Sequence, residues 1–399
     1  MMKNIQDAYI VAATRSAVSK AGRGSLKNTR PDDLLGKALQ HALTQVPTLD
    51  TAAVEDAIIG CAMPEAQQGL NIARVGLLLG GLPNTVGGIT VNRFCSSGLN
   101  AIAMAADRIR VGEADVMIAG GVESMSMVPM GGNTPSLSPE IFMSDENIGI
   151  AYGMGLTAEK VAQQWKISRE DQDAFALASH QKAIAAQAAG EFNAEIFPVQ
   201  VANRSMNLEQ GQVDIHWHEF SRDEGPRSDT SLESLAKLKS PFAARGSVTA
   251  GNSSQTSDGA GVLILASEKA IKTFGLTPLA RFLSFAVKGV PPEIMGIGPK
   301  EAIPAALRLA GLTQDDIDWY ELNEAFAAQS LAVMRDLKLD PSKVNPLGSA
   351  IALGHPLGAT GAIRAATAIH ALQRRKIKHA MVTMCVGTGM GAAGIFERC

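Results

Sequence analysis

Short apolar runs alternate with helical patterns along most of the chain. DAYIVAA (7–13), EDAIIGCAM (55–63) and ADVMIAGG (114–121) are strand-like, and RPDDLLGKALQHAL (30–43) has the spacing of an amphipathic helix. Strands that are apolar on both faces and separated by helices are typical of a sheet buried between helix layers. We therefore predict an α/β fold.

The order of these patterns recurs in the final 120 residues of the chain. A strand-like run (280–289), helical segments and a last buried run (378–397) follow one another there as they do near the amino terminus. Both parts also place a Val-Asn pair, Val91-Asn92 and Val344-Asn345, before a loop, a small-residue helix and a buried strand. This echo predicts two duplicated halves.

The segment between the halves has a different character. Residues 125–256 combine a Met-rich stretch, long polar helices and a polar loop, WHEFSRDEGPRSD (217–229). We interpret this segment as an inserted loop domain that covers the functional site. The predicted halves are then residues 1–124 with 257–278, and residues 279–399.

Composition narrows the class of protein. The chain has 399 residues, 46% of them hydrophobic, which is enough for two or three cores. A net charge of −3 with dispersed lysines and arginines argues against nucleic acid as a partner. Apolar runs stay shorter than the ~18 residues of a membrane span. Four cysteines without zinc spacing predict neither a disulfide framework nor a metal site, and favour the reducing cytoplasm.

Cys95 stands where a strand-like run ends and a small-residue helix begins, in TVNRFCSSGLNAIAMAADRIRVG (90–112). Unpaired N–H groups and the positive end of a helix favour a thiolate at such a position. Free cysteines are more often packed residues of a core. The following Ser96-Ser97-Gly98 fills space poorly but permits close backbone approach. Position alone leaves both interpretations open.

His355 lies between glycines and a proline at the start of the corresponding helix of the second half, in ALGHPLGATG (352–361). A lone histidine is more often structural than catalytic. If the duplicated halves pack face to face, however, their helix entrances meet and His355 becomes a base beside the thiol. The other histidines lie in helical or charged stretches where we expect exposure: His41, His180, His216, His218, His370 and His379.

Cys385 stands at the end of a predicted buried strand, in MCVGTGMGAAG (384–394). The glycines behind it, beginning with Gly387, let backbone N–H groups face a ligand oxygen, as an oxyanion hole requires. Asn323, in ELNEAF (321–326), precedes a predicted helix. This side chain is expected either to cap that helix or to hold a water.

These motifs together resemble those of the thiolase family, in order and at family spacing over essentially the whole chain. They are NRFCSSG (92–98), GGVESMS (120–126), GSVTAGNSSQTSDGA (246–260), NEAF (323–326), GHPLGATG (354–361) and CVGTGMG (385–391). The resemblance implies a five-layered α/β/α/β/α fold of two duplicated halves with an inserted loop domain. It also implies a homodimer or homotetramer.

The resemblance assigns chemical roles. By similarity Cys95 is the acylated nucleophile, His355 its base, and Cys385 the acid/base for the α-carbon and for the incoming CoA thiol. Cleavage of a C2–C3 bond by a thiolate creates two anions, which need two sets of donors. The enolate would be held by His355 and a water fixed by Asn323, and the tetrahedral alkoxide by the N–H groups of Cys95 and Gly387.

The same resemblance places the substrates. Ser254 and Arg227 would contact CoA, which acts as co-substrate, and no tightly bound cofactor is expected. Met125, Met127 and Met130 are candidates to line an acyl tunnel, although methionine commonly just fills space. Without the resemblance, Ser254 is simply a turn serine and Arg227 a solvated surface charge.

Loop residues favour one branch of the family. AGNSSQTSDGA and CVGTGMG differ from the AGNASGxNDGA and CxGGGQG typical of biosynthetic members, which condense two acetyl-CoA. We expect the degradative branch, which cleaves 3-oxoacyl-CoA to acetyl-CoA and a shortened acyl-CoA in fatty acid β-oxidation. Alternatives are the biosynthetic reaction, a ketosynthase, a silent acyl-CoA binder, and a redox pair of Cys95 and Cys385.

Overall fold

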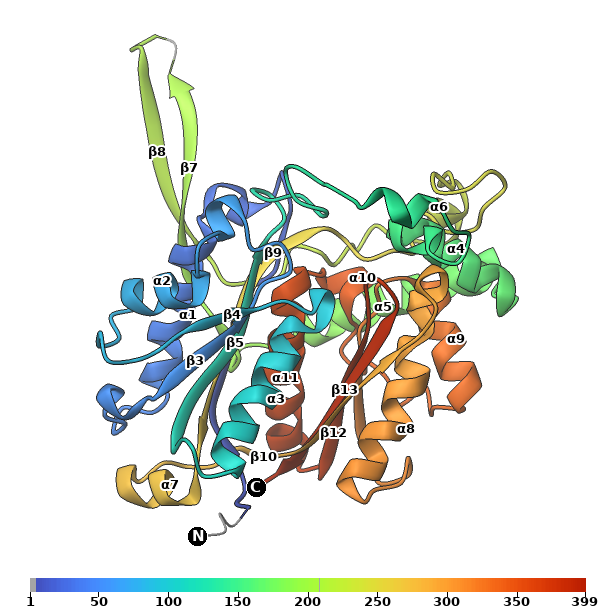
Figure 1. The fold of residues 1–399 in the computed structure, drawn as a ribbon. Helices are drawn as coiled ribbons and strands as arrows, with labels where there is room; N and C mark the ends of the chain where they lie inside the picture. Colours follow the sequence, from blue (N-terminus) through green and yellow to red (C-terminus); the bar gives the residue numbers. More distant parts are fainter. Residues whose placement is uncertain (1–4, 208) are drawn as a thin grey trace.

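A computed structural model describes residues 5–207 and 209–399, and it places two similar half-molecules side by side (Figure 1). The first half contains β1 (Tyr9–Ser16), β2 (Ser19–Lys20), α1 (Pro31–Thr44), β3 (Asp56–Gly60), α2 (Ile72–Leu79), β4 (Ile89–Val91), α3 (Ser97–Arg110), β5 (Val116–Ser124), β9 (Ser257–Ala266) and α7 (Glu268–Phe274). The second half contains β10 (Ala280–Gly289), α8 (Gly298–Ala310), β11 (Trp319–Leu322), α9 (Ala327–Leu337), α10 (Ala350–Leu353), α11 (Leu357–Arg375), β12 (His379–Val386) and β13 (Met390–Arg398).

The strand order confirms the duplication. In the first half the strands follow the order β1-β9-β5-β3, and in the second half the order β10-β13-β12-β11. Equivalent neighbours also run in the same sense, since β3/β5 and β11/β12 are parallel and the other pairs antiparallel. Within residues 5–207 and 209–399, the two sheets are joined by the pairing of β1 with β10, through Tyr9 with Arg281 and Ile10 with Ala280.

The two Val-Asn pairs occupy equivalent places. Val91 pairs in parallel with Gly60 at the end of β3, and Val344 forms a parallel bridge to Tyr320 on β11. Each pair therefore lies beside the equivalent strand of its half, β3 or β11.

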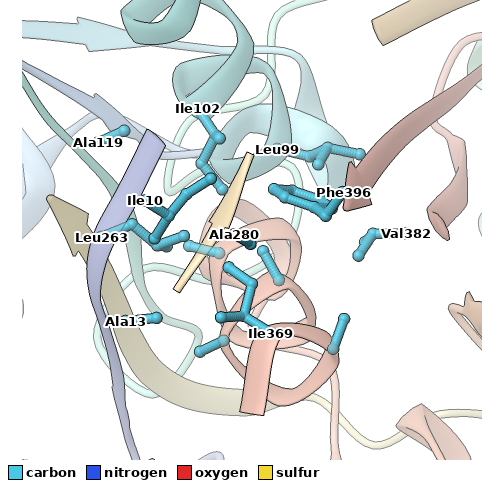
Figure 2. Close-up of a cluster of buried hydrophobic side chains, with 14 of the residues drawn as sticks. Ile10, Ala13, Leu99, Ile102, Ala119, Leu263, Ala280, Ile369, Val382 and Phe396 are labelled. Carbon is cyan, nitrogen blue, oxygen red and sulfur yellow. The ribbon is translucent and has the colours of Figure 1, made fainter. Parts of the chain in front are cut away.

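Buried side chains define five layers. Helices α1 and α2 cover one face of the first sheet, and α8 and α9 cover the far face of the second sheet. Helices α3 and α11 lie between the sheets and share one core with both (Figure 1). Figure 2 shows this central core, where Ile10 and Leu263 of the first sheet, Leu99 of α3 and Ile369 of α11 approach Phe396 of the second.

The alternation along β5 explains the layering. Met117 and Ala119 point into the central core, whereas Val116 and Ile118 pack under α1 and α2. Every residue of β5 is buried, which is the pattern of a strand covered on both faces. No helix of the described residues combines the length and the apolar character that crossing a bilayer takes.

The segment 125–256 lies between β5 and β9. Its elements are α4 (Met154–Gln164), α5 (Arg169–Ala188), β6 (Ile196–Phe197), β7 (Val199–Asn207), β8 (Gln212–Phe220) and α6 (Leu232–Ala236). Strands β7 and β8 form a two-stranded ribbon that projects from the body (Figure 1). Because β6 pairs with β1, the segment also touches the sheet of the first half. The division into domains stays a prediction.

Candidate active site

Cys95 lies in a tight turn between the edge strand β4 and α3. Its neighbour Phe94 has φ 43°, a left-handed conformation that is rare and strained for a bulky residue. The N–H of Phe94 donates to Oδ1 of Asn92 at 2.8 Å, and its carbonyl accepts from Oγ of Ser97 at 2.6 Å. These contacts hold the strained turn and so fix Cys95 at the entrance of α3.

The Cys95 thiol is protonated at rest. Burial raises its pKa to about 12. The N–H groups of Gly387 and of Cys95 itself oppose this shift because they hydrogen-bond to the sulfur and stabilise its anion. The resting group is therefore a thiol, and attack requires a base. The two N–H groups proposed for the alkoxide do meet at this sulfur.

His355 is buried in the loop between α10 and α11, with 4% of its surface exposed. Its Nδ1 lies 2.7 Å from Oγ1 of Thr360, whose hydroxyl donates to the carbonyl of Pro356 at 2.9 Å. The Thr360 oxygen therefore accepts a hydrogen bond from Nδ1–H, so Nδ1 carries the ring proton and Nε2 keeps a lone pair. Burial and the positive charge of Arg364 lower the pKa of His355 to about 3. The imidazole is neutral and able to act as a base.

Asn323 directly follows β11 and is fully buried. Its Nδ2 lies 3.3 Å from Nε2 of His355, and its Oδ1 has no hydrogen-bond partner among the described residues. The helix-cap alternative is wrong, because Phe326 occupies the N-cap position of α9 and bonds to Gln329. A buried acceptor beside the base can hold a water or a substrate donor.

Cys385 is fully buried near the end of β12. Burial raises the pKa of its thiol, and a negative charge on Cys95 raises it further. Cys385 therefore rests as a proton donor. The glycines that follow Cys385 have different roles. The N–H of Gly387 contacts the sulfur of Cys95. Gly391 allows close packing instead, because a Cβ there would lie 2.0 Å from backbone atoms of Gly298.

A cavity of about 530 Å³ brings the predicted reactive groups together. Cys95, Cys385 and His355 all line it, and so does Ser254. The remaining wall is largely apolar and includes Met125, Met130, Met154, Leu156, Phe242, Met295, Phe326 and Leu357. Met127, a candidate for an acyl tunnel, is not among the lining residues, whereas Met125 and Met130 are.

Arg227 lies outside that cavity, in an adjoining hollow of about 270 Å³ that shares Gln255 with it. Two further cations, Lys20 and Arg23, line the same hollow. They come from a turn near the amino terminus and carry no sequence signal of a site. Only the tertiary fold brings this turn to the loop domain, which is why sequence reasoning missed both residues.

The hollow also corrects an expectation about His180. This histidine is 5% exposed rather than lying on the surface, and its Nδ1 accepts the N–H of Arg227 at 3.1 Å. Burial and the charges of Arg227 and Lys20 lower its pKa to about 4, so it stays a neutral acceptor. The guanidinium of Arg227 pairs with Asp229 at 2.8 Å in an exposed position.

Comparison with known proteins agrees with this architecture. Two family descriptions match the chain: "Thiolase, N-terminal domain" over residues 8–269 and "Thiolase, C-terminal domain" over residues 276–398. A "3-ketoacyl-CoA thiolase" of Bacillus subtilis is 50% identical over 402 residues, which cover 99% of this chain and 100% of the relative. A "Beta-ketoadipyl-CoA thiolase" of Escherichia coli is 45% identical over 410 residues, again covering 99% and 100%.

A solved structure shares the fold. The crystal structure of the Bacillus anthracis acetyl-CoA acetyltransferase superposes with a TM-score of 0.89 at 39% identity, and the match covers 100% of both chains. Whole-chain matches in sequence and in structure confirm the resemblance seen in the motifs. The chain belongs to the thiolase family, whose members are acyltransferases.

Proposed function

We propose that this thiolase cleaves 3-oxoacyl-CoA with CoA, releasing acetyl-CoA and a shortened acyl-CoA. Support comes from the cavity in which two protonated thiols, Cys95 and Cys385, and one neutral imidazole, His355, share an apolar wall. Cleavage needs a nucleophile, a base to activate it and an acid to protonate the leaving carbon. These three groups supply those functions.

The first half-reaction transfers the acyl group to the enzyme. His355 takes the proton of Cys95, and the thiolate attacks C3 of the substrate. The C2–C3 bond then breaks, and its electron pair goes to C2 of the departing acetyl-CoA. Cys385 protonates that carbon and becomes a thiolate. The raised pKa of Cys385 suits this step, because the group begins as an acid.

The second half-reaction restores the enzyme. The thiol of CoA gives its proton to the Cys385 thiolate and attacks the acyl group on Cys95. The Cys95 sulfur leaves and recovers the proton that His355 has held. Protons and electrons therefore balance over the cycle, and each group returns to its resting state. No tightly bound cofactor takes part in this scheme, and CoA acts as co-substrate.

Two anion sites complete the scheme. The N–H groups of Cys95 and Gly387, which already bond to the Cys95 sulfur, would stabilise the tetrahedral alkoxide at the acylated cysteine. The enolate oxygen would lie between His355 and a water held by Asn323, whose Oδ1 is buried without a partner among the described residues. Donors fixed in advance are effective because they need no reorganisation during the reaction.

CoA would extend from the cavity into the basic hollow. Ser254 lines the cavity, and Arg227 lies in the hollow with Lys20 and Arg23. Three cations there match the phosphate groups of CoA. The exposed pair of Arg227 with Asp229 contributes little to stability because solvent screens it, so the guanidinium can turn from Asp229 to a phosphate.

The apolar cavity also favours cleavage of 3-oxoacyl-CoA with an uncharged chain over the reactions of an oxoadipyl-CoA thiolase or a biosynthetic thiolase. An acyl chain that lies against methionine and phenylalanine side chains gains about 0.8 kcal/mol for each buried CH₂. The apolar wall offers no cation to the distal carboxylate of an oxoadipyl group. We therefore favour unbranched, uncharged 3-oxoacyl chains, as in fatty acid β-oxidation, over condensation of two acetyl-CoA.

A chain-length series tests this function. CoA-dependent cleavage is measured from acetoacetyl-CoA to 3-oxohexadecanoyl-CoA, and the acylated enzyme is trapped and weighed. Cys95→Ser should lose cleavage by several orders of magnitude without an acyl adduct, whereas Cys399→Ser, an exposed thiol, should behave as wild type. Cleavage of acetoacetyl-CoA alone would support the biosynthetic alternative.

The same material separates the other rivals. Decarboxylative condensation of malonyl-CoA would indicate a ketosynthase, and binding of acyl-CoA without turnover would indicate a silent binder. A redox pair of Cys95 and Cys385 would gain activity from oxidation. The proposed thiolase instead needs both thiols reduced. For the same reason we propose the reducing cytoplasm as its location, consistent with four free cysteines.

We also propose that a second copy of the chain covers the ribbon of β7 and β8. The register places Met206, Val213, Ile215 and Trp217 on one face, and these side chains are 50–75% exposed. Trp217 shares a hollow with Leu79 of α2, so this face continues onto the outside of the first half. An isolated two-stranded ribbon is marginally stable in water, which indicates that it needs a partner surface.

The amount of apolar surface fits a homo-oligomer. Among the described residues, eight of the 19 exposed large hydrophobic side chains lie on the ribbon, on α2, on β4 and in the loop before α2: Leu70, Leu78, Leu79, Ile89, Met206, Val213, Ile215 and Trp217. A standard interface buries about 800 Å² per subunit, and these side chains would supply apolar surface for it. Sedimentation should show a dimer or tetramer that Trp217→Ser weakens and Asn203→Ser, on the polar face, does not. A monomeric wild type would contradict this proposal.

A further inference from the structure

The carboxylate of Glu123 is fully buried near the end of β5, and the reaction scheme does not use it. Its Oε2 accepts the N–H groups of Ala62 and Gly358, each at 2.7 Å. Its Oε1 accepts Nε2 of Gln68 at 2.7 Å and the N–H of Met63 at 3.3 Å. These four N–H donors enclose the carboxylate, and Sγ of Cys61 lies 3.8 Å from Oε1 as a fifth, weaker donor.

The donors come from both half-molecules. Three of them belong to the segment 62–68 that follows β3, in the first half. The fourth, Gly358, lies in the first turn of α11, three residues after His355. A carboxylate at the amino end of a 19-residue helix also meets the positive end of its dipole. Glu123 therefore ties the helix that follows the base to the half that carries the nucleophile.

The backbone is shaped for this contact. A Cβ on Gly358 would lie 2.7 Å from Oε2 of Glu123 and 2.7 Å from the N of Ala62. A Cβ on Gly121 would lie 2.2 Å from the carbonyl oxygen of Gly358. Glycine at both positions lets β5 and α11 approach until the carboxylate reaches the helix.

The contacts also select the charged form of Glu123. All four nitrogen partners are donors, so a protonated acid would direct its O–H towards an N–H group. Burial raises the pKa of Glu123, and these four hydrogen bonds oppose that shift. The charge acts on the nucleophile as well, because Glu123 contributes to the raised pKa of Cys95.

We propose that Glu123 is a positioning residue that holds the start of α11 so that His355 faces Cys95. The inference rests on the roles proposed for Cys95 and His355. The carboxylate also has a second, opposite effect, because its negative charge adds to the burial that disfavours a thiolate at Cys95. The two effects can be separated by experiment.

Glu123→Gln tests both effects. The amide NH₂ of glutamine has to face one pair of N–H donors. Gln68 cannot turn to receive it, because Oε1 of Gln68 accepts the N–H of Ser124 at 2.5 Å and its Nε2 also donates to Met63. We expect the misplaced base to lower kcat on the order of 10²-fold while the KM for CoA stays unchanged. Loss of the charge should shift the pH profile of Cys95 alkylation by iodoacetamide to lower pH.

Loosening of the fold would also expose Cys95 and speed its alkylation, so the signature of the proposal is the contrast between Glu123→Gln and Glu123→Asp. Glu123→Asp keeps the charge with a shorter reach, so it should lower kcat and leave the alkylation profile at the wild-type position. The matched control is Glu55→Gln, which removes a carboxylate that accepts the N–H groups of Asp115 and Val116 at the other end of β5. Both of its readouts should match wild type.

Folded fraction is measured by circular dichroism, and rates are expressed per folded molecule. A wild-type kcat together with an unshifted alkylation profile in Glu123→Gln would overturn the role of Glu123. If that variant does not fold, a wild-type kcat in Glu123→Asp would overturn it instead. Failure of the wild-type chain to acylate Cys95 is a different result, because it refutes the proposed function itself.

Discussion

Nδ2 of Asn323 lies 3.3 Å from Nε2 of His355, while the other ring nitrogen of His355 lies 2.7 Å from Oγ1 of Thr360. The Thr360 hydroxyl gives its own proton to the carbonyl of Pro356. This short chain of contacts decides which imidazole nitrogen carries the proton. The other nitrogen, Nε2, keeps its lone pair and accepts a hydrogen bond from Nδ2 of Asn323, whose Oδ1 is a buried acceptor.

Thr360→Val should impair the base without removing it. Valine has nearly the same shape but cannot accept a hydrogen bond from Nδ1–H of His355. The tautomer with its proton on Nδ1 is then no longer favoured. Loss of a hydrogen bond worth about 1–1.5 kcal/mol corresponds to roughly tenfold in kcat. Steady-state thiolysis measures this effect. Thr360→Ser keeps the hydroxyl and should retain most of the activity, and equal rates for the two variants would contradict the tautomer assignment.

Stability should fall in mild acid because of His355. The folded-state pKa is about 3, and the pKa in the unfolded chain is ~6.5, so below pH 6.5 the unfolded chain binds a proton that the folded chain refuses. The contribution is fully present above pH 6.5 and declines towards pH 3. Between pH 7 and pH 5 it amounts to about 2 kcal/mol in the free energy of unfolding.

Urea unfolding of His355→Asn at both pH values measures this contribution. Asparagine does not titrate, so the loss of stability between pH 7 and pH 5 should be smaller in the variant by that amount. Comparing each protein with itself removes any constant effect of the substitution. An identical decrease in both proteins would show that His355 is not held neutral.

Arg227→Gln should weaken CoA binding with little effect on stability. The exposed pair with Asp229 contributes little to folding, whereas a phosphate would lose one of three cations in the hollow. We expect KM for CoA to rise about tenfold, more at low salt than at high salt, with kcat nearly unchanged. Arg222→Gln provides the control, since Arg222 contacts Gln187 and does not line the hollow. Equal KM values in the two variants would refute the assignment.

Gly155→Ala should narrow the acyl cavity. A Cβ at this position would lie 2.1 Å from Cδ1 of Phe242, and both residues line the cavity, so the ring has to move. The KM for acyl-CoA substrates should rise about tenfold or more, with a smaller change in kcat. Gly289→Ala is the control, because Gly289 does not line the cavity and its Cβ would lie 3.9 Å from the carbonyl oxygen of Gly389. Adding Phe242→Val should restore KM, and an unaltered KM in Gly155→Ala would show that the ring does not bound the substrate.

The sequence predicted the layout of the site because its reactive residues lie at ends of strands and starts of helices. Cys95 and His355 begin equivalent helices of duplicated halves, so packing those helices together also brings their entrances together. The cavity follows from that symmetry. Motif order and apolar periodicity were sufficient for this part of the prediction.

Protonation states were not predictable in the same way. The helix entrance was expected to favour a thiolate at Cys95, yet burial raises the pKa of Cys95 and of Cys385. The depth of a side chain depends on every layer around it, which local sequence does not record. The sequence also did not identify Lys20 and Arg23 as site residues. They lie in a surface turn that reaches Arg227 only through the tertiary fold.

The central helix layer determines how the molecule unfolds. Helices α3 and α11 fill the space between the sheets, and the sheets themselves pair at only two positions. Neither half contains a complete hydrophobic core, because separating the halves would expose the apolar residues of the shared central core to water. Halves expressed as individual polypeptides should aggregate, and the intact chain should melt in one cooperative transition.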